Sequence, residues 1–331
     1  MRALVCSEPG PISGLAVADL PVPEPGPREV LVRVEAAGLN YPDVLIVQGR
    51  YQVKPPPPFV AGMELAGTVA AVGAEVKGLR AGDPVMGTST TGAFAESCLV
   101  SAERVLPRPA SLPADLAAAS LVTYGTTLHA LEDRARLQPG ETVLVLGAAG
   151  GVGTAAIELA KLLGARVVAA ASSAEKLELC RRLGADELVD YGKEDLRQRL
   201  KDLTGGRGVD VVYDPVGGPT TEVALRATGW GGRLLVIGFA AGDIPKLPAN
   251  LTLLNERSIL GAYWGEWSQR NREASAAGLR RIAEWIGAGR LRPAVTRRLR
   301  LEDVPVAMVD LVERRVLGKL VVLPSVRGDG R

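Results

Sequence analysis

Histidine is almost absent from this chain of 331 residues, since His129 is its single copy. One histidine excludes a histidine-rich metal site and a His-Glu-x-x-His metalloprotease, which needs two histidines on one helix face. A Ser-His-Asp triad would have to use His129, which lies in a helix-like run with no Gly-x-Ser-x-Gly motif nearby. We therefore interpret His129 as a structural residue with a satisfied hydrogen bond.

Cysteine and long apolar runs are also scarce. The three cysteines lie far apart and show none of the paired spacings of zinc or redox motifs. No stretch of about 18 apolar residues is free of charge, as a membrane span would require. The amino terminus lacks the basic and apolar regions of a signal peptide. We expect a cytoplasmic protein with reduced thiols and no membrane partner.

An excess of charge of either sign is missing as well. The chain has 39 basic and 37 acidic residues, which gives a formal net charge of +2. This balance argues against a dedicated nucleic-acid binder, whose binding face would be strongly basic. Apolar residues make up 47% of the chain, as in ordinary globular proteins. The length suggests two domains, and small-molecule chemistry becomes the default expectation.

The first 120 residues have the pattern of β structure. Residues 29–36 alternate apolar and polar side chains with period two, as a half-buried strand does. Further short strands bounded by glycine and proline are expected at 67–73, 83–87 and 94–100. The long gaps between these strands favour a barrel-like all-β unit.

From about residue 121 the pattern changes to alternating strands and helices. Apolar strands separated by amphipathic helices are typical of a parallel sheet covered on both faces, so we predict a doubly wound α/β domain. A final apolar run, 318–324, is too isolated to form its own core, and we expect it to return to the β unit. The expected strands are 142–147, 166–171, 187–189, 209–214 and 232–238, and the expected helices are 154–163, 175–183, 196–203 and 274–286.

A glycine-rich turn joins the first of these strands to its helix. Small residues at this place let the backbone approach a pyrophosphate, whose charge the helix N-terminus stabilises. The match to Gly-x-Gly-x-x-Gly is incomplete, because Ala148 stands at the first glycine. The strand before and the helix after it make a nicotinamide dinucleotide site the best interpretation. Its predicted binding residues are Ala149, Gly150, Gly151, Val152 and Gly153.

The next strand indicates which dinucleotide binds. Enzymes that use NAD place an acidic residue at the tip of this strand, against the ribose 2′-hydroxyl. Here the tip reads Ala171-Ser172-Ser173, with no acid. Ser172, Lys176 and Tyr191 could instead reach a 2′-phosphate, so the sequence predicts NADPH. The alternative is that Lys176 and Tyr191 are ordinary surface residues.

Several motifs together resemble the medium-chain dehydrogenase/reductase superfamily and, within it, the zinc-free NADPH:quinone oxidoreductases related to zeta-crystallin. The resemblance implies a GroES-like β-barrel catalytic domain, residues 1–122 and 265–331, and a Rossmann domain, residues 123–264. It also implies a homodimer that pairs through residues 258–261. The motifs occupy residues 36–43, 49–51, 62–69, 81–85, 148–153 and 208–214.

The same resemblance implies that no metal is bound. In the zinc-dependent alcohol dehydrogenases of the superfamily, a cysteine stands at the position of Asn40 and a histidine at that of Met63. The four-cysteine structural zinc lobe is missing too. Without a Lewis acid, the hydride acceptor must already be electron-poor, as quinones and α,β-unsaturated carbonyls are. We interpret the nearby carboxylates, Asp43 and Glu64, as structural hydrogen-bond acceptors.

The resemblance also implies individual site residues. Asn40 is the first candidate to donate a hydrogen bond to the oxyanion that develops on the acceptor, and Tyr51 and Tyr41 are weaker candidates. Further residues are expected beside the nicotinamide end of the cofactor: Asn40, Thr123, Val216, Gly238, Phe239 and Lys319.

Three functions remain open from the sequence. The first is an NADPH:quinone oxidoreductase, and the second is an enoyl or alkenal reductase that uses the same scaffold on a C=C bond. The third is a relative that binds nucleotide or RNA without turnover, which the arginine-rich stretch 270–315 would favour. Acidic residues are interspersed in that stretch, and no aromatic-basic RNA platform is evident.

Overall fold

The computed structural model describes residues 1–326 and divides into two compact units. The first unit comprises Met1–Val122 and Leu279–Arg331, and the second comprises Thr123–Gly278. Residues 327–331, which the sequence assigns to the first unit, lie outside the described residues. The second boundary falls inside helix α10 (Arg272–Gly287) rather than after residue 264. The reason is that the preceding helix, α9 (Trp264–Arg270), packs on His129 of the second unit through Trp267.

The second unit is built on a six-stranded sheet in the order β11-β10-β9-β12-β13-β14, with every neighbouring pair parallel. Numbered along the sheet-forming chain, this is the order 3-2-1-4-5-6 of a dinucleotide-binding fold, which confirms the predicted Rossmann architecture. The order reverses between β9 and β12. The strands are β9 (Thr142–Val145), β10 (Arg166–Ala171), β11 (Glu187–Asp190), β12 (Val209–Asp214), β13 (Thr228–Val236) and β14 (Ser258–Gly261).

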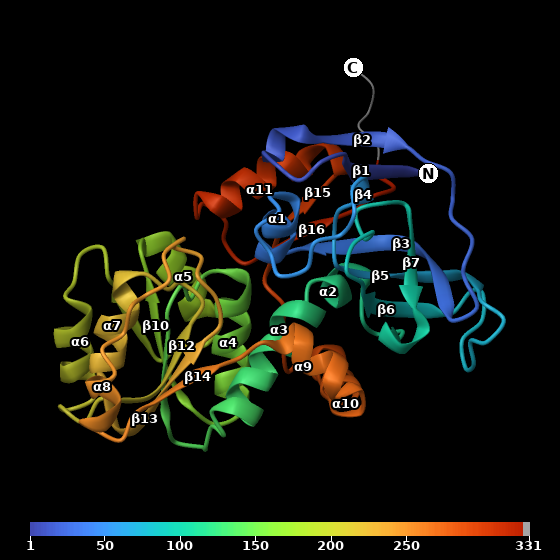
Figure 1. Cartoon of the computed structure of the whole chain (residues 1–331). Helices are drawn as coiled ribbons and strands as arrows, with labels where there is room; N and C mark the ends of the chain where they lie inside the picture. The colour runs from blue at the N-terminus through green and yellow to red at the C-terminus, as the bar shows by residue number, and fades with distance from the viewer. Residues whose placement is uncertain (327–331) are drawn as a thin grey trace. The chain divides into compact units, whose positions relative to one another are not determined.

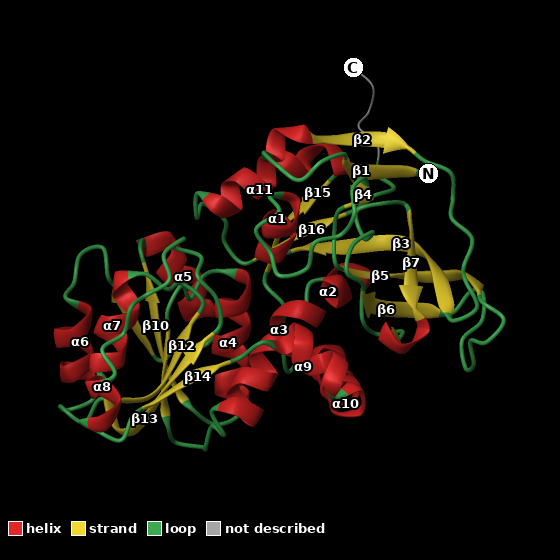
Figure 2. Ribbon diagram, viewed as in Figure 1, coloured by secondary structure: helices red, strands yellow, loops and turns green. Residues whose placement is uncertain are grey.

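Helices cover both faces of this sheet. Figure 2 shows α6 and α7 on one face and α4 on the other, which explains why the central strands are mostly apolar. Val143, Leu144 and Val145 of β9, for example, are completely buried. The helices are α3 (Leu121–Leu128), a π-helix (His129–Arg134), α4 (Gly151–Leu162), α5 (Ala174–Arg182), α6 (Leu196–Leu203), α7 (Pro219–Arg226), α8 (Asn250–Leu253) and α9.

The first unit contains two sheets, one of three strands in the order β2-β1-β4 and one of seven strands (Figure 1). The larger sheet runs β15-β16-β3-β5-β6-β8, and β7 also pairs with β3. The strands are β1 (Arg2–Cys6), β2 (Leu15–Asp19), β3 (Glu29–Leu39), β4 (Phe59–Val60), β5 (Glu64–Val72), β6 (Pro84–Thr88), β7 (Ser97–Ser101), β8 (Val105–Pro107), β15 (Val295–Leu299) and β16 (Lys319–Val322).

The last strand confirms the expected return of the chain. β16 pairs antiparallel with β3, with Leu320 opposite Leu39, and its four residues are buried. One expected strand is shorter than predicted, because β7 begins at Ser97 rather than at residue 94. The carbonyl of Phe94 instead accepts a hydrogen bond from the Leu4 N–H at 2.9 Å.

Few helices accompany these sheets. The sequence does not predict α1, although it carries a helix-start signal in Pro42 and in Asp43, whose carboxylate accepts the Asn40 N–H at 2.8 Å. None of the helices in the described part of the chain is long and apolar enough to cross a membrane. The α-helices of this unit are α1 (Tyr41–Val47), α2 (Ala114–Ala118), part of α10 and α11 (Val304–Val312).

Candidate cofactor site and buried polar cluster

The turn after β9 packs against the turn after β12, where the strand order reverses. Gly147 has φ +55°, and a Cβ there would lie 2.8 Å from Cγ2 of Val216. A Cβ on Gly153 would lie 2.4 Å from the carbonyl oxygen of Gly147. Only glycine fits both positions, so the sequence of this turn follows from its close packing. Ligands of such sheets bind outside the carboxyl ends of the strands at this reversal.

The incomplete glycine fingerprint has a simple explanation. The left-handed backbone conformation falls on Gly147, one residue before the expected first glycine. Ala148 has an ordinary backbone conformation, and its N–H donates to the carbonyl of Ala170 at 3.2 Å. The alanine is therefore accommodated without strain, and the turn keeps its tight path.

Helix α4 presents an open N-terminus to this turn. Its N-cap residue is Gly150, so no side chain caps it, and its first turn holds no acidic residue. The helix is 12 residues long, and its backbone N–H groups and dipole favour an anion here. Residues 149–153, the predicted pyrophosphate contacts, all lie at this place.

Asp214, at the end of β12, fixes the facing turn. It is buried, and its carboxylate accepts hydrogen bonds from the N–H groups of Val216 at 2.8 Å and Gly217 at 3.0 Å. Its second oxygen accepts from the hydroxyl of Thr221 at 2.6 Å. The sequence did not assign this role to Asp214. The available signal was an acidic residue at the last position of a buried strand.

At the tip of β10, the structure brings Ser172 and Lys176 together and places the backbone of Tyr191 beside Ala171. The ammonium of Lys176 donates to the hydroxyl of Ser172 at 3.1 Å, and the Tyr191 N–H donates to the Ala171 carbonyl at 3.2 Å. The tip of β10 has no acidic side chain. The carboxylate of Asp190, at the end of β11, is buried and accepts the Gly192 N–H at 3.1 Å.

The turns after β12 and β13 are joined by backbone hydrogen bonds. The Ala241 N–H donates to the Val216 carbonyl at 2.7 Å, and Phe239, beside Gly238, packs against Gly217. Thr123 is buried in α3, where its carbonyl accepts the Thr127 hydroxyl at 2.8 Å. The predicted residues Val216, Gly238 and Phe239 therefore share one end of the sheet.

The first unit holds a buried polar cluster of Asn40, Glu64 and Lys319. The ammonium of Lys319 donates to Glu64 Oε1 at 2.5 Å and to Asn40 Oδ1. The amide of Asn40 donates to Glu64 Oε1 at 2.7 Å and to the Gly38 carbonyl at 3.3 Å. The other oxygen of Glu64 accepts the Val122 N–H at 2.8 Å. Glu64 accepts from the amide nitrogen of Asn40 and Lys319 donates to its oxygen, so this pair orients the amide.

Asp43 lies beside this cluster. Its Oδ2 accepts the Asn40 N–H, while its Oδ1 is buried and has no hydrogen-bond partner among the described residues. Burial raises the pKa of Asp43 to about 7, and the nearby charge of Lys319 opposes this shift. Asp43 is thus a carboxyl group that changes charge near neutral pH.

The two tyrosines predicted as weaker candidates also lie in the first unit. Tyr41 is the first residue of α1, and Tyr51 is half-buried against the hydrophobic core of the unit. The geometry within this unit brings together Asn40 and Lys319, whereas the remaining predicted cofactor contacts belong to the second unit. The roles of these side chains toward substrate stay predictions.

Metal-ligating side chains do not gather in the described part of the chain. Among residues 1–326, no group of three or more histidine, cysteine, aspartate or glutamate side chains is placed to hold a metal ion. Met63 is half-buried, and the amide of Asn40 is occupied by Glu64 and Lys319.

Two family models match the chain. Residues 26–110 match the alcohol dehydrogenase GroES-like domain, and residues 151–280 match the zinc-binding dehydrogenase family. The matched segments fall in the β unit and in the α/β unit respectively, which agrees with the fold.

Named relatives and solved structures extend these matches over nearly the whole chain. Quinone oxidoreductase-like protein 2 of Rattus norvegicus is 38% identical over 97% of this chain and 91% of its own length. A quinone oxidoreductase of Pseudomonas aeruginosa is 37% identical over 91% and 93%. The structure of Escherichia coli quinone oxidoreductase with NADPH matches with a TM-score of 0.90 at 29% identity, covering 98% of this chain and 100% of that one.

Another solved structure is described as an NAD-dependent alcohol dehydrogenase. It is 36% identical, has a TM-score of 0.89 and covers 98% of this chain and 100% of that one. The relatives of 38% and 37% identity assign the family, because they match 97% and 91% of this chain. The chain belongs to the quinone oxidoreductase family of the medium-chain dehydrogenases and reductases.

Proposed function

We propose that this protein is a zinc-independent, NADPH-dependent reductase of quinones. The observation that carries the proposal is the site at the carboxyl ends of β9 and β10. It combines an open helix N-terminus for a pyrophosphate with a serine and a lysine where NAD enzymes have an acid. The E. coli relative, solved with NADPH, supports the same cofactor.

The residues of the second unit suit two of the phosphate groups of NADPH. The N–H groups at the start of α4 would bind the pyrophosphate, and Ser172, Lys176 and Tyr191 would bind the 2′-phosphate. A lysine ammonium favours a phosphate over a hydroxyl, because it adds a charge-assisted hydrogen bond. The structure described as an NAD-dependent alcohol dehydrogenase makes this preference worth a direct test.

Hydride from the bound cofactor requires an acceptor that is already electron-poor if no metal polarises it. The positions of two zinc ligands in the metal-dependent branch are taken by Asn40 and Met63. We propose that Asn40 donates to the carbonyl oxygen of the acceptor, with Tyr41 and Tyr51 as further donors. The 3.3 Å bond from the amide to the Gly38 carbonyl is the longer of its two donor contacts and the one an acceptor would replace.

The decisive experiment is the initial rate of NADPH oxidation by EDTA-treated protein, with a small quinone and, in parallel, with an enone. We expect turnover of the quinone that chelation does not reduce. A preference for the enone would move the activity to reduction of activated C=C bonds. No turnover of either acceptor would overturn the proposal and favour a non-enzymatic binding protein, to be tested by a salt-dependent RNA gel shift.

We also propose that the protein is a homodimer. β14 lies at one edge of the six-stranded sheet and pairs only with β13 among the described strands. Pairing with β14 of a second copy across a two-fold axis would cover this edge.

A further inference from the structure

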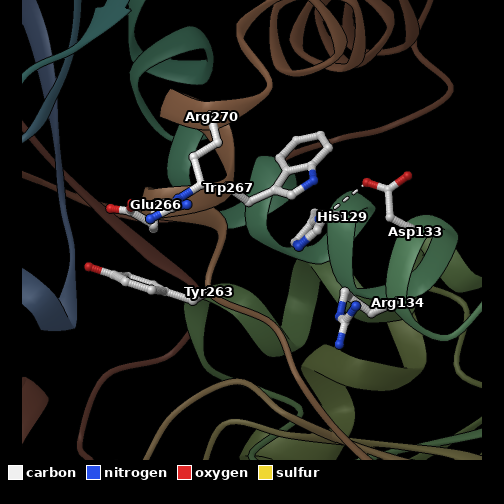
Figure 3. A pocket seen from close by; sticks show the side chains of 7 residues that line it. All are labelled: His129, Asp133, Arg134, Tyr263, Glu266, Trp267 and Arg270. Atoms are coloured by element: carbon white, nitrogen blue, oxygen red, sulfur yellow. Dashed lines mark hydrogen bonds and ion pairs between the residues drawn. The ribbon is translucent and has the colours of Figure 1, made fainter.

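The second unit contains a cavity that the proposed reaction does not use. It has a volume of about 390 Å³, within the range of small-molecule sites. Its walls come from the π-helix, from α9 and from the residue before α9 (Figure 3). The lining residues are His129, Asp133, Arg134, Tyr263, Glu266, Trp267 and Arg270.

His129 is held rigidly in the wall of this cavity. Its ring stacks on the indole of Trp267, with 4.3 Å between the ring centroids and 27° between the planes. Its Nδ1 lies 2.8 Å from the carboxylate of Asp133. Only 5% of the residue is exposed. The predicted structural role with a satisfied hydrogen bond therefore accounts for one of the two ring nitrogens.

The second ring nitrogen has a different environment. Figure 3 shows that Nε2 points away from Asp133, into the space between Tyr263 and Arg134. A carboxylate at Nδ1 favours the proton on that nitrogen, so the neutral ring presents the lone pair of Nε2. His129 therefore offers the cavity a hydrogen-bond acceptor whose direction is fixed by Asp133 and Trp267.

The charged residues that line the cavity differ in whether a partner engages their charge. Arg270 pairs with Glu266 at 2.7 Å, and Asp133 is engaged by His129. The Nε of Arg134 donates to the Gly261 carbonyl at 2.9 Å, and no carboxylate pairs with this guanidinium among residues 1–326. Its terminal nitrogens can therefore bind an anion. Tyr263, which is 47% exposed, adds a flat apolar surface.

We propose that this cavity binds a small hydroxyaryl carboxylate. The ligand's hydroxyl donates to Nε2 of His129, its carboxylate accepts from Arg134, and its ring packs against Tyr263. An acceptor, a cation and an aromatic surface at one cavity match these three groups. The site is distinct from the proposed cofactor contacts and does not depend on the proposed reductase activity.

The single histidine allows a direct test with ¹⁵N-histidine-labelled full-length protein. In long-range ¹H–¹⁵N spectra of the free protein at alkaline pH, we expect one protonated nitrogen at Nδ1 and one unprotonated nitrogen at Nε2. Titration with 4-hydroxybenzoate, which NADPH does not reduce, should shift the Nε2 resonance with saturation. Benzoate, which lacks the hydroxyl, should leave that resonance nearly unchanged.

Two matched variants identify the anion contact. Arg134→Gln should weaken binding of 4-hydroxybenzoate about tenfold, as expected for loss of a charged hydrogen bond. Arg136→Gln removes the same charge two residues further along the chain, outside the lining of the cavity. This variant should bind 4-hydroxybenzoate normally. A proton on Nε2 in the free protein, no saturable shift, or equal binding by both variants would overturn the proposal. None of these results depends on NADPH turnover.

Discussion

Asp43 shows how burial of a single carboxyl group changes the stability of the protein with pH. Its pKa rises from 3.8 to about 7 on folding, mainly through burial. The folded state therefore prefers the protonated form, and the stability this gives is lost as pH rises between those two values. A pKa difference of about three corresponds to about 4 kcal/mol of unfolding free energy. Asp43→Asn cannot ionise, so its unfolding midpoint in urea should fall less than the wild-type midpoint across this range.

The measurement is a set of urea unfolding curves at several pH values for both proteins. Asparagine keeps an oxygen that can accept the Asn40 N–H, so helix α1 should retain its start. Parallel pH profiles of the two midpoints would show that Asp43 does not titrate in this window.

Lys176 provides a test of cofactor preference at the same scale. If its ammonium binds the 2′-phosphate, Lys176→Gln should raise KM for NADPH about tenfold and leave KM for NADH within about twofold. Lys201→Gln, on the exposed side of α6, serves as a charge-matched control and should change neither. Steady-state kinetics with both cofactors checks this. Equal losses with NADPH and NADH would mean that Lys176 acts only on the local structure.

Single residues differ in how far the sequence could predict them. The turn at Gly147–Gly153 is contiguous and packs against itself, so a short sequence motif predicts it. The bond between Lys319 and Glu64 joins residues 255 positions apart, and no local pattern indicates it. Asp133, the partner of His129, lies one helical turn away in the sequence. The surroundings of the His129 ring also depend on α9, which lies far along the chain.

At the scale of elements, the turn between β9 and α4 tolerates little change. A Cβ on Gly153 would lie 2.4 Å from the Gly147 carbonyl oxygen and 2.7 Å from that of Ala148. Both are backbone atoms, so the start of α4 must move. Gly153→Ala should cost about 1–3 kcal/mol of stability and weaken NADPH binding at least about tenfold.

Thermal unfolding and fluorescence titration with NADPH measure these two effects. Gly14→Ala is a suitable control, because a Cβ there meets nothing within 4 Å and the backbone is not left-handed. Normal NADPH binding by Gly153→Ala would show that the turn does not form the pyrophosphate site.

The sequence predicts elements correctly where their burial is uniform. After their first residues, β9 and β10 are apolar on both faces, so the sequence predicts these strands without knowledge of their neighbours. Helix α1 was missed because its seven residues follow a long strand directly and its start depends on a bond to the buried Asp43. The return of β16 was predicted because an apolar strand of this length cannot form a core alone.

At the scale of the whole molecule, the chain leaves the β unit, completes the α/β unit and returns. This order follows from the sequence, since the strand and helix patterns change near residue 121. The return point does not, because it lies inside helix α10, where the sequence pattern does not change. The stacking of Trp267 on His129 assigns α9 to the second unit, and this contact is tertiary.

The edge of the six-stranded sheet carries the last prediction. β14 exposes Ile259, which is 38% exposed, and its free edge would remain a template for further pairing unless it is covered. In an antiparallel pair of β14 strands, Ile259→Asp brings two like charges close to the two-fold axis, where they repel. Sedimentation equilibrium should show a dimer for the wild type and a monomer for this variant.

Ile244→Asp is the control, because it places the same charge outside the strand, on a residue that is 72% exposed. This variant should remain dimeric. A monomeric wild type would require another way of protecting this edge, whereas equal dissociation of both variants would place the interface outside β14.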